Sequence, residues 1–275
     1  MIAVLGATGT IGTHVAAGLA ASGAEARALV RDPALPGLAL PTAQADLRDF
    51  RSLRAALDGA EQLFLLTPHG PDQDLLEANA VDAAKAAGVR RIVKISGGAP
   101  SLGPNGVSST AIAHWRSERR IEDSGLRFCF LRPSFLMQNL LAMTPKLGLL
   151  PAPMGHAPIA MVDARDVAEC AVAQLLDAGA ADTAWHLTGP APVTFKDVAA
   201  RLGARYINVP PRLAAIALAR QGASAFEIDH ALRMAAYFAS GADGAPTDAV
   251  RRITGRPPRT LEDFLTSHHP STKGN

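Results

Sequence analysis

The stretch Met1-Ile-Ala-Val-Leu-Gly6-Ala-Thr-Gly9-Thr-Ile-Gly12 opens the chain and decides its fold. Apolar residues up to the first glycine predict a short buried strand, and the regularly spaced glycines then lead into a helix. The first glycine allows a tight turn, the second lets backbone N–H groups approach a pyrophosphate, and the third lets helix and strand pack closely. A helix N-terminus also favours an anion. We therefore expect cofactor contacts from Gly6, Thr8, Gly9, Thr10, Ile11 and Gly12.

Strand and helix patterns alternate as far as residue 131. Ile11, Val15 and Leu19 give the first helix one apolar face, and a second strand follows over residues 25–30. Such alternation predicts an α/β protein with a Rossmann-type, doubly wound and mainly parallel sheet. Further strands are expected to end near residue 46 and to cover 62–67, 91–96 and 126–131, with helices over 48–57, 72–88 and 109–123.

The second half of the chain is less regular. Residues 143–158 predict a long loop, with a short hairpin as the alternative, and a Pro-rich tail is expected after residue 239. Helices are expected over 166–176, with Asp166 as N-cap, and over 194–202, 212–220 and 224–239. We expect an NAD(P)-binding domain over 1–133 with a returning segment at about 159–188, and a smaller substrate-covering lobe from 134–158 and 189–275.

Composition excludes several classes of protein. The net charge is +2 without a basic run, which argues against a nucleic-acid partner. Cys129 and Cys170 lie in apolar runs without metal-ligand spacing, so we expect reduced core thiols and no metal site. A strand at residue 2 and the lack of a run of about 18 apolar residues argue against a signal peptide and a membrane partner. The expectation is a cytoplasmic protein, monomer or homodimer, that acts on a small molecule.

Ligands of such sheets bind beyond the carboxyl ends of the strands. Arg31, after the second strand, has the planar fork that pairs with the 2′-phosphate of NADP(H), while Asp32 would instead hold a ribose or cap the loop. We therefore favour NADPH and keep NADH as the alternative. Asp46 is expected near the adenine, or else as the N-cap of the next helix. The same positional argument adds Leu47, Thr67, Pro68, Ser96, Pro133 and Phe135 as cofactor contacts.

With these residues in view, nearly the whole chain resembles the NmrA-like branch of the atypical short-chain dehydrogenase/reductases. The resemblance implies NAD(P)H-dependent reductases, with relatives that act on quinones, azo and triarylmethane dyes and iminium compounds, and it also includes non-catalytic redox sensors. The matching segments are Gly6–Gly12, Val30-Arg31-Asp32-Pro33, Ala45-Asp46-Leu47, Leu65-Leu-Thr67-Pro68, Val89–Gly97, His114-Trp-Arg-Ser-Glu118, Leu131–Asn139, Asp163-Ala-Arg-Asp166-Val-Ala, Leu187-Thr-Gly-Pro190 and Thr254-Gly-Arg-Pro257.

The usual catalytic pair of such enzymes, Tyr and Lys four residues apart on one helix, is missing. Neither Tyr206 nor Tyr237 has a lysine four residues later. The corresponding helix carries His114 and Glu118 on one face. One interpretation makes His114 a proton donor or substrate ligand that Glu118 orients or charges. The other is a hydrogen bond or ion pair on the helix surface.

The missing pair also bears on the substrate. A ketone needs a proton at oxygen as hydride arrives, and general acid catalysis is worth roughly 10²–10⁴-fold. Quinones, iminium ions and conjugated dyes take up hydride without it. The sequence therefore predicts an NADPH-dependent reductase of an electron-poor organic acceptor, with Phe135 and Gln138 on the substrate side. The alternative is a non-catalytic NADP(H) sensor that acts through a protein partner.

Overall fold

A computed structural model describes residues 1–143, 145–177, 179 and 181–268. The chain divides into two compact units. The first comprises Met1–Arg132 and Val167–His186, and the second comprises Pro133–Asp166 and Leu187–Asn275.

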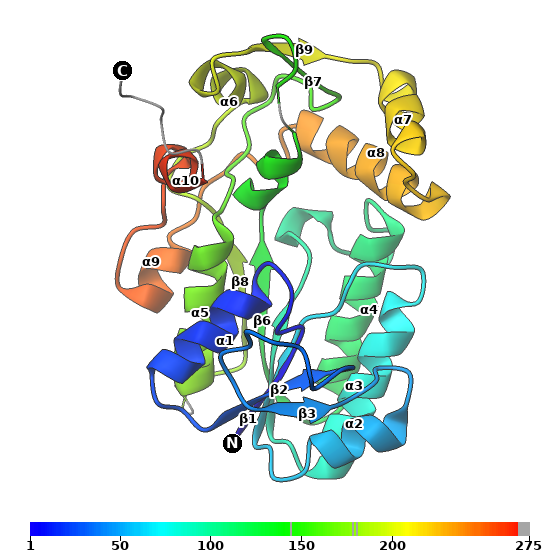
Figure 1. The fold of residues 1–275 in the computed structure, drawn as a ribbon, viewed down its shortest axis with the longest axis vertical. Helices are drawn as coiled ribbons and strands as arrows, with labels where there is room; N and C mark the ends of the chain where they lie inside the picture. Colours follow the sequence, from blue (N-terminus) through cyan, green and yellow to red (C-terminus); the bar gives the residue numbers. More distant parts are fainter. Residues whose placement is uncertain (144, 178, 180, 269–275) are drawn as a thin grey trace. The chain divides into compact units, whose positions relative to one another are not determined.

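A seven-stranded sheet forms the centre of the first unit (Figure 1). The strand order is β3-β2-β1-β4-β5-β6-β8, and the pairings from β3 through to β6 are parallel. Order 3-2-1-4-5-6 is that of a Rossmann fold, so the predicted fold class is confirmed. The strands are β1 Ile2–Leu5, β2 Ala26–Val30, β3 Thr42–Gln44, β4 Gln62–Leu65, β5 Arg91–Ile95, β6 Arg127–Pro133 and β8 Thr183–Leu187.

Helices cover both faces of this sheet, so its central strands are buried on both sides. Every residue of β1 and β5 is buried, as expected for parallel strands between helical layers. On one face α1 packs against α5, where Gly18 faces the side chain of Val172. On the other face α2, α3 and α4 lie next to one another (Figure 1). The bounds are α1 Gly12–Ala21, α2 Phe50–Ala56, α3 Gln73–Ala87, η1 Ala99–Ser101, α4 Ser109–Asp123 and α5 Ala164–Leu176.

Two expected helix caps are replaced by neighbouring aspartates. Asp49, and not Asp46, caps α2, because its side chain accepts a hydrogen bond from the backbone of Arg51. At α5, Asp163 precedes the helix and accepts from the backbone N–H of Arg165, while Asp166 lies in the first turn. Both helices have several aspartates near their start, and spacing alone does not select the cap.

The second unit contains a two-stranded parallel sheet of β7 Leu149–Ala152 and β9 Arg205–Asn208. A short hairpin turn lies within residues 143–158, as expected: Lys146 and Leu149 form an antiparallel bridge through two backbone hydrogen bonds of 2.9 Å. The further partner of β7 was not expected, because it comes from more than fifty residues further along the chain. The expected Pro-rich tail contains two helices, α9 and α10. The helices of this unit are η2 Met137–Ala142, α6 Phe195–Arg201, α7 Pro211–Arg220, α8 Ala225–Ala239, α9 Ala249–Thr254 and α10 Leu261–His268. Within the described ranges, no helix is both long and apolar enough to cross a bilayer.

Candidate active site

At Gly6 and Gly12, the turn between β1 and α1 has room for backbone only. Gly6 has φ +79°, and a Cβ there would lie 2.5 Å from the backbone oxygen of Leu66. A Cβ on Gly12 would lie 1.9 Å from the backbone oxygen of Gly6. The turn is closed by a 3.0 Å hydrogen bond from the N–H of Gly9 to the oxygen of Gly6. Both positions therefore require glycine for reasons of space.

The first turn of α1 fits a pyrophosphate. Ile11, the N-cap residue, makes no side-chain capping bond, and the first turn has no acidic residue. Thr8, Gly9 and Thr10 are exposed beside it. Because no acidic residue lies in this first turn, its backbone N–H groups and the helix dipole suit the phosphates of a dinucleotide.

The side chains expected around the adenosine half lie at the carboxyl ends of β2 and β3. Arg31 directly follows β2 and is exposed, and its guanidinium makes no ion pair with the described residues. The other arginine at this edge, Arg48, is paired with Asp72. Asp32 binds its own loop, since its carboxylate accepts from the N–H of Ala34 at 2.9 Å. Asp46 accepts from the N–H of Arg48 at 2.9 Å, and the backbone oxygen of Leu47 accepts from Asn79. Arg31 is thus the cation at this edge that remains available to a phosphate.

The residues that end β4 and β5 differ in exposure. Pro68 is exposed, whereas Thr67 and Ser96 are buried. The hydroxyl of Thr67 donates to Oε1 of Glu77 at 2.7 Å. The hydroxyl of Ser96 has no hydrogen-bond partner within the described residues. Thr67 therefore connects the rim of the sheet to a buried polar cluster.

That cluster contains Glu77 of α3, Lys94 of β5 and His114 of α4, which we call the Glu–Lys–His cluster. Nζ of Lys94 donates to both carboxylate oxygens of Glu77 at 2.7 Å and lies 3.2 Å from Nδ1 of His114. Glu77 and Lys94 are fully buried, and His114 is 4% exposed. Three elements of the first unit thus bring two charges and an imidazole together.

The ion pair determines the charge of the carboxyl group. Burial raises the pKa of Glu77, but the charge of the Lys94 ammonium and its hydrogen bonds outweigh this effect and hold the pKa below its usual value. Glu77 is therefore a carboxylate at neutral pH. A buried pair of this kind requires both partners, because a single charge left in the interior is costly.

The structure assigns Glu118 to a different partner from the one predicted. Its carboxylate accepts from Nε of Arg132 at 2.9 Å and from Nη2 at 2.6 Å, which is a bidentate ion pair. The carboxylate near His114 is that of Glu77, with Oε1 4.0 Å from Nδ1. The expected pairing of His114 with Glu118 is therefore wrong, because the guanidinium from β6 competes for the same carboxylate.

Sequence reasoning missed Glu77, Lys94 and Gln73 as members of this site. A lysine in the middle of the apolar strand 91–96 is the one available signal, because a buried lysine requires a partner. Nothing in the sequence identifies that partner as Glu77. The amide nitrogen of Gln73, also buried, lies 3.2 Å from Nδ1 and 3.3 Å from Nε2 of His114.

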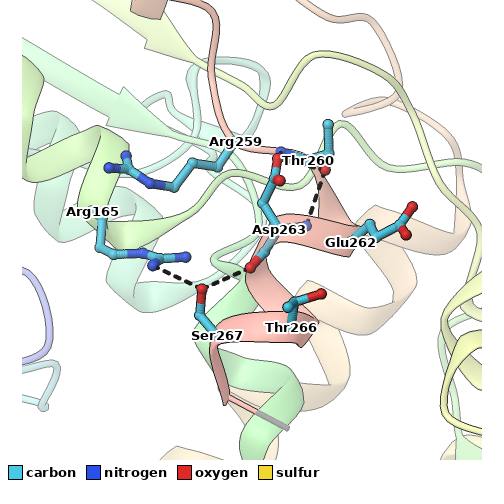
Figure 2. A pocket seen from close by; sticks show the side chains of 7 residues that line it. All are labelled: Arg165, Arg259, Thr260, Glu262, Asp263, Thr266 and Ser267. Atoms are coloured by element: carbon cyan, nitrogen blue, oxygen red, sulfur yellow. Dashed lines mark hydrogen bonds between the residues drawn. The ribbon is translucent and has the colours of Figure 1, made fainter. Parts of the chain in front are cut away.

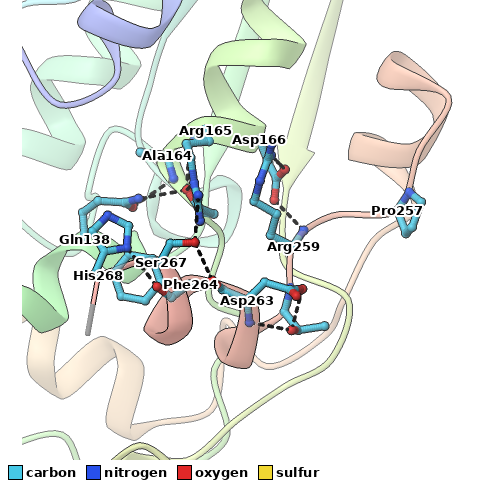
Figure 3. A network of polar contacts seen from close by, with 12 residues as sticks. Gln138, Ala164, Arg165, Asp166, Pro257, Arg259, Asp263, Phe264, Ser267 and His268 are labelled. Carbon is cyan, nitrogen blue, oxygen red and sulfur yellow. Dashed lines mark hydrogen bonds and ion pairs between the residues drawn. The ribbon is translucent and has the colours of Figure 1, made fainter. Parts of the chain in front are cut away.

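The remaining predicted residues belong to the second unit. Phe135 is buried and makes edge-to-face contacts with Phe195 and Phe238, and Pro133 is half-buried at the end of β6. The amide of Gln138 donates to Asp163 and accepts from the backbone N–H of Ala164, both at 2.9 Å. Figure 3 shows Gln138 beside Ala164 and Arg165. Both ends of this amide are thus committed to the start of α5.

A cavity of about 620 Å³ in the second unit has a polar lining (Figure 2). Its two arginines are bound to buried carboxylates: Arg165 to Asp163, and Arg259 to Asp166. Asp166 also accepts from the backbone N–H of Arg259 at 2.7 Å and from Arg256 at 3.1 Å. This network, part of which is drawn in Figure 3, ties the C-terminal helices to the first turn of α5. The cavity is lined by Arg165, Arg259, Thr260, Glu262, Asp263, Thr266 and Ser267.

The strand order and the glycine turn define the class of Rossmann-type dinucleotide-binding proteins. A sequence model of the NmrA-like family matches residues 1–202. The chain belongs to the NmrA-like family, so the resemblance seen in the sequence is confirmed.

Several enzymes are similar to this chain over nearly its full length. An NAD(P)H azoreductase of Xenophilus azovorans is 35% identical, with 98% of each chain covered. A (4-alkanoyl-5-oxo-2,5-dihydrofuran-3-yl)methyl phosphate reductase of Streptomyces griseus is 34% identical, again with 98% of each covered. Among solved structures, an NADPH-dependent quinone oxidoreductase of Escherichia coli, complexed with NADPH, superimposes with a TM-score of 0.89 at 28% identity, covering 98% of this chain and 100% of that one.

Proposed function

We propose that this protein is an NADPH-dependent reductase that transfers hydride to a small, electron-poor organic acceptor with a conjugated double bond. The observation that carries the proposal is full-length similarity to reductases, combined with a turn in which Gly6 and Gly12 admit no side chain. The prediction of an oxidoreductase made from the sequence agrees with these relatives. The alternative of a non-catalytic sensor gains no support from them.

The named relatives suggest the class of acceptor. Their names specify azo compounds, quinones and an unsaturated lactone that bears an acyl group. In each of these compounds a hydride adds to one end of a conjugated system, and the negative charge moves to an electronegative atom at the other end. Such an anion is stable enough to form without a strong acid beside it. A chain without the Tyr and Lys pair suits this chemistry.

One set of residues binds the cofactor, and His114 polarises the acceptor. When bound, the nicotinamide supplies the hydride. Backbone N–H groups of Thr10, Ile11 and Gly12 hold the pyrophosphate, since that of Gly9 is bonded to the oxygen of Gly6, and Arg31 holds the 2′-phosphate. Thr67 and Ser96 line the end of the sheet next to the Glu–Lys–His cluster. His114 offers a ring N–H to the acceptor atom that becomes negative, which is stabilisation of a developing charge by a fixed dipole.

The test follows NADPH oxidation with a panel of quinones, azo dyes, unsaturated lactones and saturated aliphatic ketones. We expect turnover of the conjugated acceptors and rates at least about 100-fold lower for the ketones, because these need a general acid. Tight NADPH binding without oxidation across the panel overturns the proposal. Ketone reduction as fast as quinone reduction contradicts the acceptor class.

Arg31 sets the preference for NADPH under this proposal. Arg31→Ala is expected to raise the Kd for NADPH by about 10-fold or more, because a hydrogen bond to a charged group is worth about 1.5–3 kcal/mol, and to leave the Kd for NADH unchanged. The control is Arg119→Ala on α4, whose side chain pairs with Glu122 of the same helix. The measurement is calorimetric titration with both cofactors. An unchanged ratio of the two Kd values after Arg31→Ala contradicts the assignment.

A further inference from the structure

Lys94 lies at the centre of the Glu–Lys–His cluster. Its ammonium group lies within hydrogen-bond distance of both oxygens of Glu77, of Nδ1 of His114 and of the backbone oxygen of Ile95, the last two at 3.2 Å. An ammonium group has three N–H donors and no acceptor. The four neighbouring atoms therefore share three N–H groups, and none of them can donate to Nζ.

This requirement fixes the ring of His114. If Nδ1 carried a proton, its N–H would point at a group that can only donate. Nδ1 must therefore be the bare, accepting nitrogen, and the single proton of the neutral ring must lie on Nε2. The carboxylate of Glu77 does not change this, because its nearer oxygen is 4.0 Å from Nδ1, beyond hydrogen-bond distance.

Gln73 fits the same arrangement. Its amide nitrogen is nearly equidistant from the two ring nitrogens of His114, and its buried Oε1 has no hydrogen-bond partner within the described residues. The same nitrogen lies 3.4 Å from Oε1 of Glu77. Its N–H groups therefore donate to that carboxylate oxygen and to the bare Nδ1 of His114, whereas an amide turned by half a rotation would set its oxygen against these two acceptors. The contacts of Gln73 thus agree with the tautomer that Lys94 requires.

The positive charge next to His114 comes from a strand and not from the helix that carries His114. Position 118, one turn further along α4, is Glu118, which is bound to Arg132. Lys94 of β5 supplies the ammonium group instead. The buried carboxylate of Glu77 holds the ammonium in place through two short hydrogen bonds.

We propose that Lys94, anchored by Glu77, is a positioning residue that holds His114 as the Nε2–H tautomer and so presents a hydrogen-bond donor to the acceptor atom that gains negative charge. The proposal rests on the proposed reductase function for the role of that donor. The tautomer itself follows from the contacts of Lys94 alone. No proton needs to leave His114, because a hydrogen bond is enough to stabilise a delocalised anion.

The first test is nitrogen-15 NMR of the imidazole groups in the full-length protein, with His114 assigned by the signals that disappear in His114→Gln. We expect a protonated Nε2 and a hydrogen-bonded, unprotonated Nδ1 at pH 7. A proton on Nδ1, or on both nitrogens, overturns the proposal. This readout needs no turnover, so it separates the positioning role of Lys94 from the reductase function.

The second test removes the charge pair. Lys94→Met alone leaves the buried carboxylate of Glu77 without a compensating positive charge and is expected to destabilise the fold. The variant is therefore Glu77→Gln with Lys94→Met, which contains no buried charge at either position. We expect the fixed tautomer to give way to a mixture and kcat with a quinone to fall by about 10-fold or more. The kcat is measured at saturating NADPH, because Thr67, an expected cofactor contact, donates to Glu77 and the substitution can therefore change the Kd for NADPH.

The control is Asp82→Asn with Arg120→Met, which removes an exposed ion pair between the same two helices, α3 and α4. It is expected to leave the tautomer and kcat as in the unmodified protein. An unchanged tautomer and an unchanged kcat in the Glu77→Gln/Lys94→Met variant contradict the proposal. Failure of the unmodified protein to reduce any acceptor overturns the proposed function, whereas the tautomer measurement still decides what Lys94 does.

Discussion

Gly12→Ala is expected to destabilise the free protein by about 3 kcal/mol and to weaken NADPH binding by at least about 100-fold. The added Cβ would lie 1.9 Å from the backbone oxygen of Gly6, 2.6 Å from its carbonyl carbon and 3.0 Å from Cα of Ala7. These are backbone atoms, so no side-chain rotation relieves the overlap. The turn itself must move, and with it the N–H groups expected to hold the pyrophosphate. Thermal unfolding and calorimetric titration with NADPH measure the two effects.

Two other glycines provide matched controls. A Cβ on Gly9 would lie 3.4 Å from the oxygen of Gly6, so Gly9→Ala is expected to change stability by less than about 1 kcal/mol and yet to weaken NADPH binding. Gly23, at the end of α1, has φ +71°, and a Cβ added there would meet no atom within 4 Å. Gly23→Ala is expected to cost about 1 kcal/mol in stability without changing the Kd. Equal NADPH affinity in the Gly9 and Gly23 variants would contradict the assignment of the turn.

Asp166→Ala is expected to lower the free energy of unfolding of the protein by about 3 kcal/mol. The carboxylate is fully buried and accepts from the backbone and guanidinium of Arg259 and from Arg256. Removing one partner of a buried ion pair costs about 3–5 kcal/mol. We take the lower end, because the side chain of Arg256 is 36% exposed and that of Arg259 is 25% exposed. Water therefore partly compensates both arginines for the lost carboxylate. Denaturant unfolding followed by circular dichroism is the measurement.

The control for this variant is Asp229→Ala. Asp229 forms an exposed ion pair with Arg233 on α8, with both carboxylate oxygens 2.8 Å from Nε. Exposed pairs of this spacing are worth about 0.3–0.5 kcal/mol. A loss in Asp166→Ala no larger than in Asp229→Ala would show that the network around α10 adds little to stability.

Most of the first unit could be predicted from the sequence, because its order follows from local patterns. The run from Gly6 to Gly12, the apolar strands and the helix stop at Gly88 are each specified by neighbouring residues. Helix α4 begins and ends where its pattern predicts, and the side chain of Ser108 caps it. A parallel sheet with helical crossovers then leaves few possible topologies.

The second unit was harder to predict, because its elements depend on partners far away in the sequence. Strand β9 has only four residues, and it is stabilised by pairing with β7. Helices α9 and α10 lie among prolines that suggest a loop, and α10 is fixed by packing of Leu261 and Phe264 and by a Thr260–Asp263 capping box. Such tertiary contacts override local propensity.

In the candidate site, too, some features follow from local sequence and others depend on distant contacts. Positions on the glycine turn follow from spacing, whereas the partners of charged side chains do not. His114 and Glu118 share a helix face, but Arg132 from β6 and Lys94 from β5 decide which carboxylate each of them meets. A helical wheel contains no information about the strand that lies beneath it. Pairing of buried charges is a property of the packed sheet and helices together.

The network at Asp166 also has a practical consequence for dissecting this protein. The family match ends at residue 202, which invites expression of a shorter fragment. Such a fragment lacks Arg256 and Arg259, and it would expose a carboxylate that is fully buried in the intact chain. The smallest unit worth purifying therefore extends through α10. Recombinant boundaries for this chain should follow its buried charges and not the limits of sequence similarity.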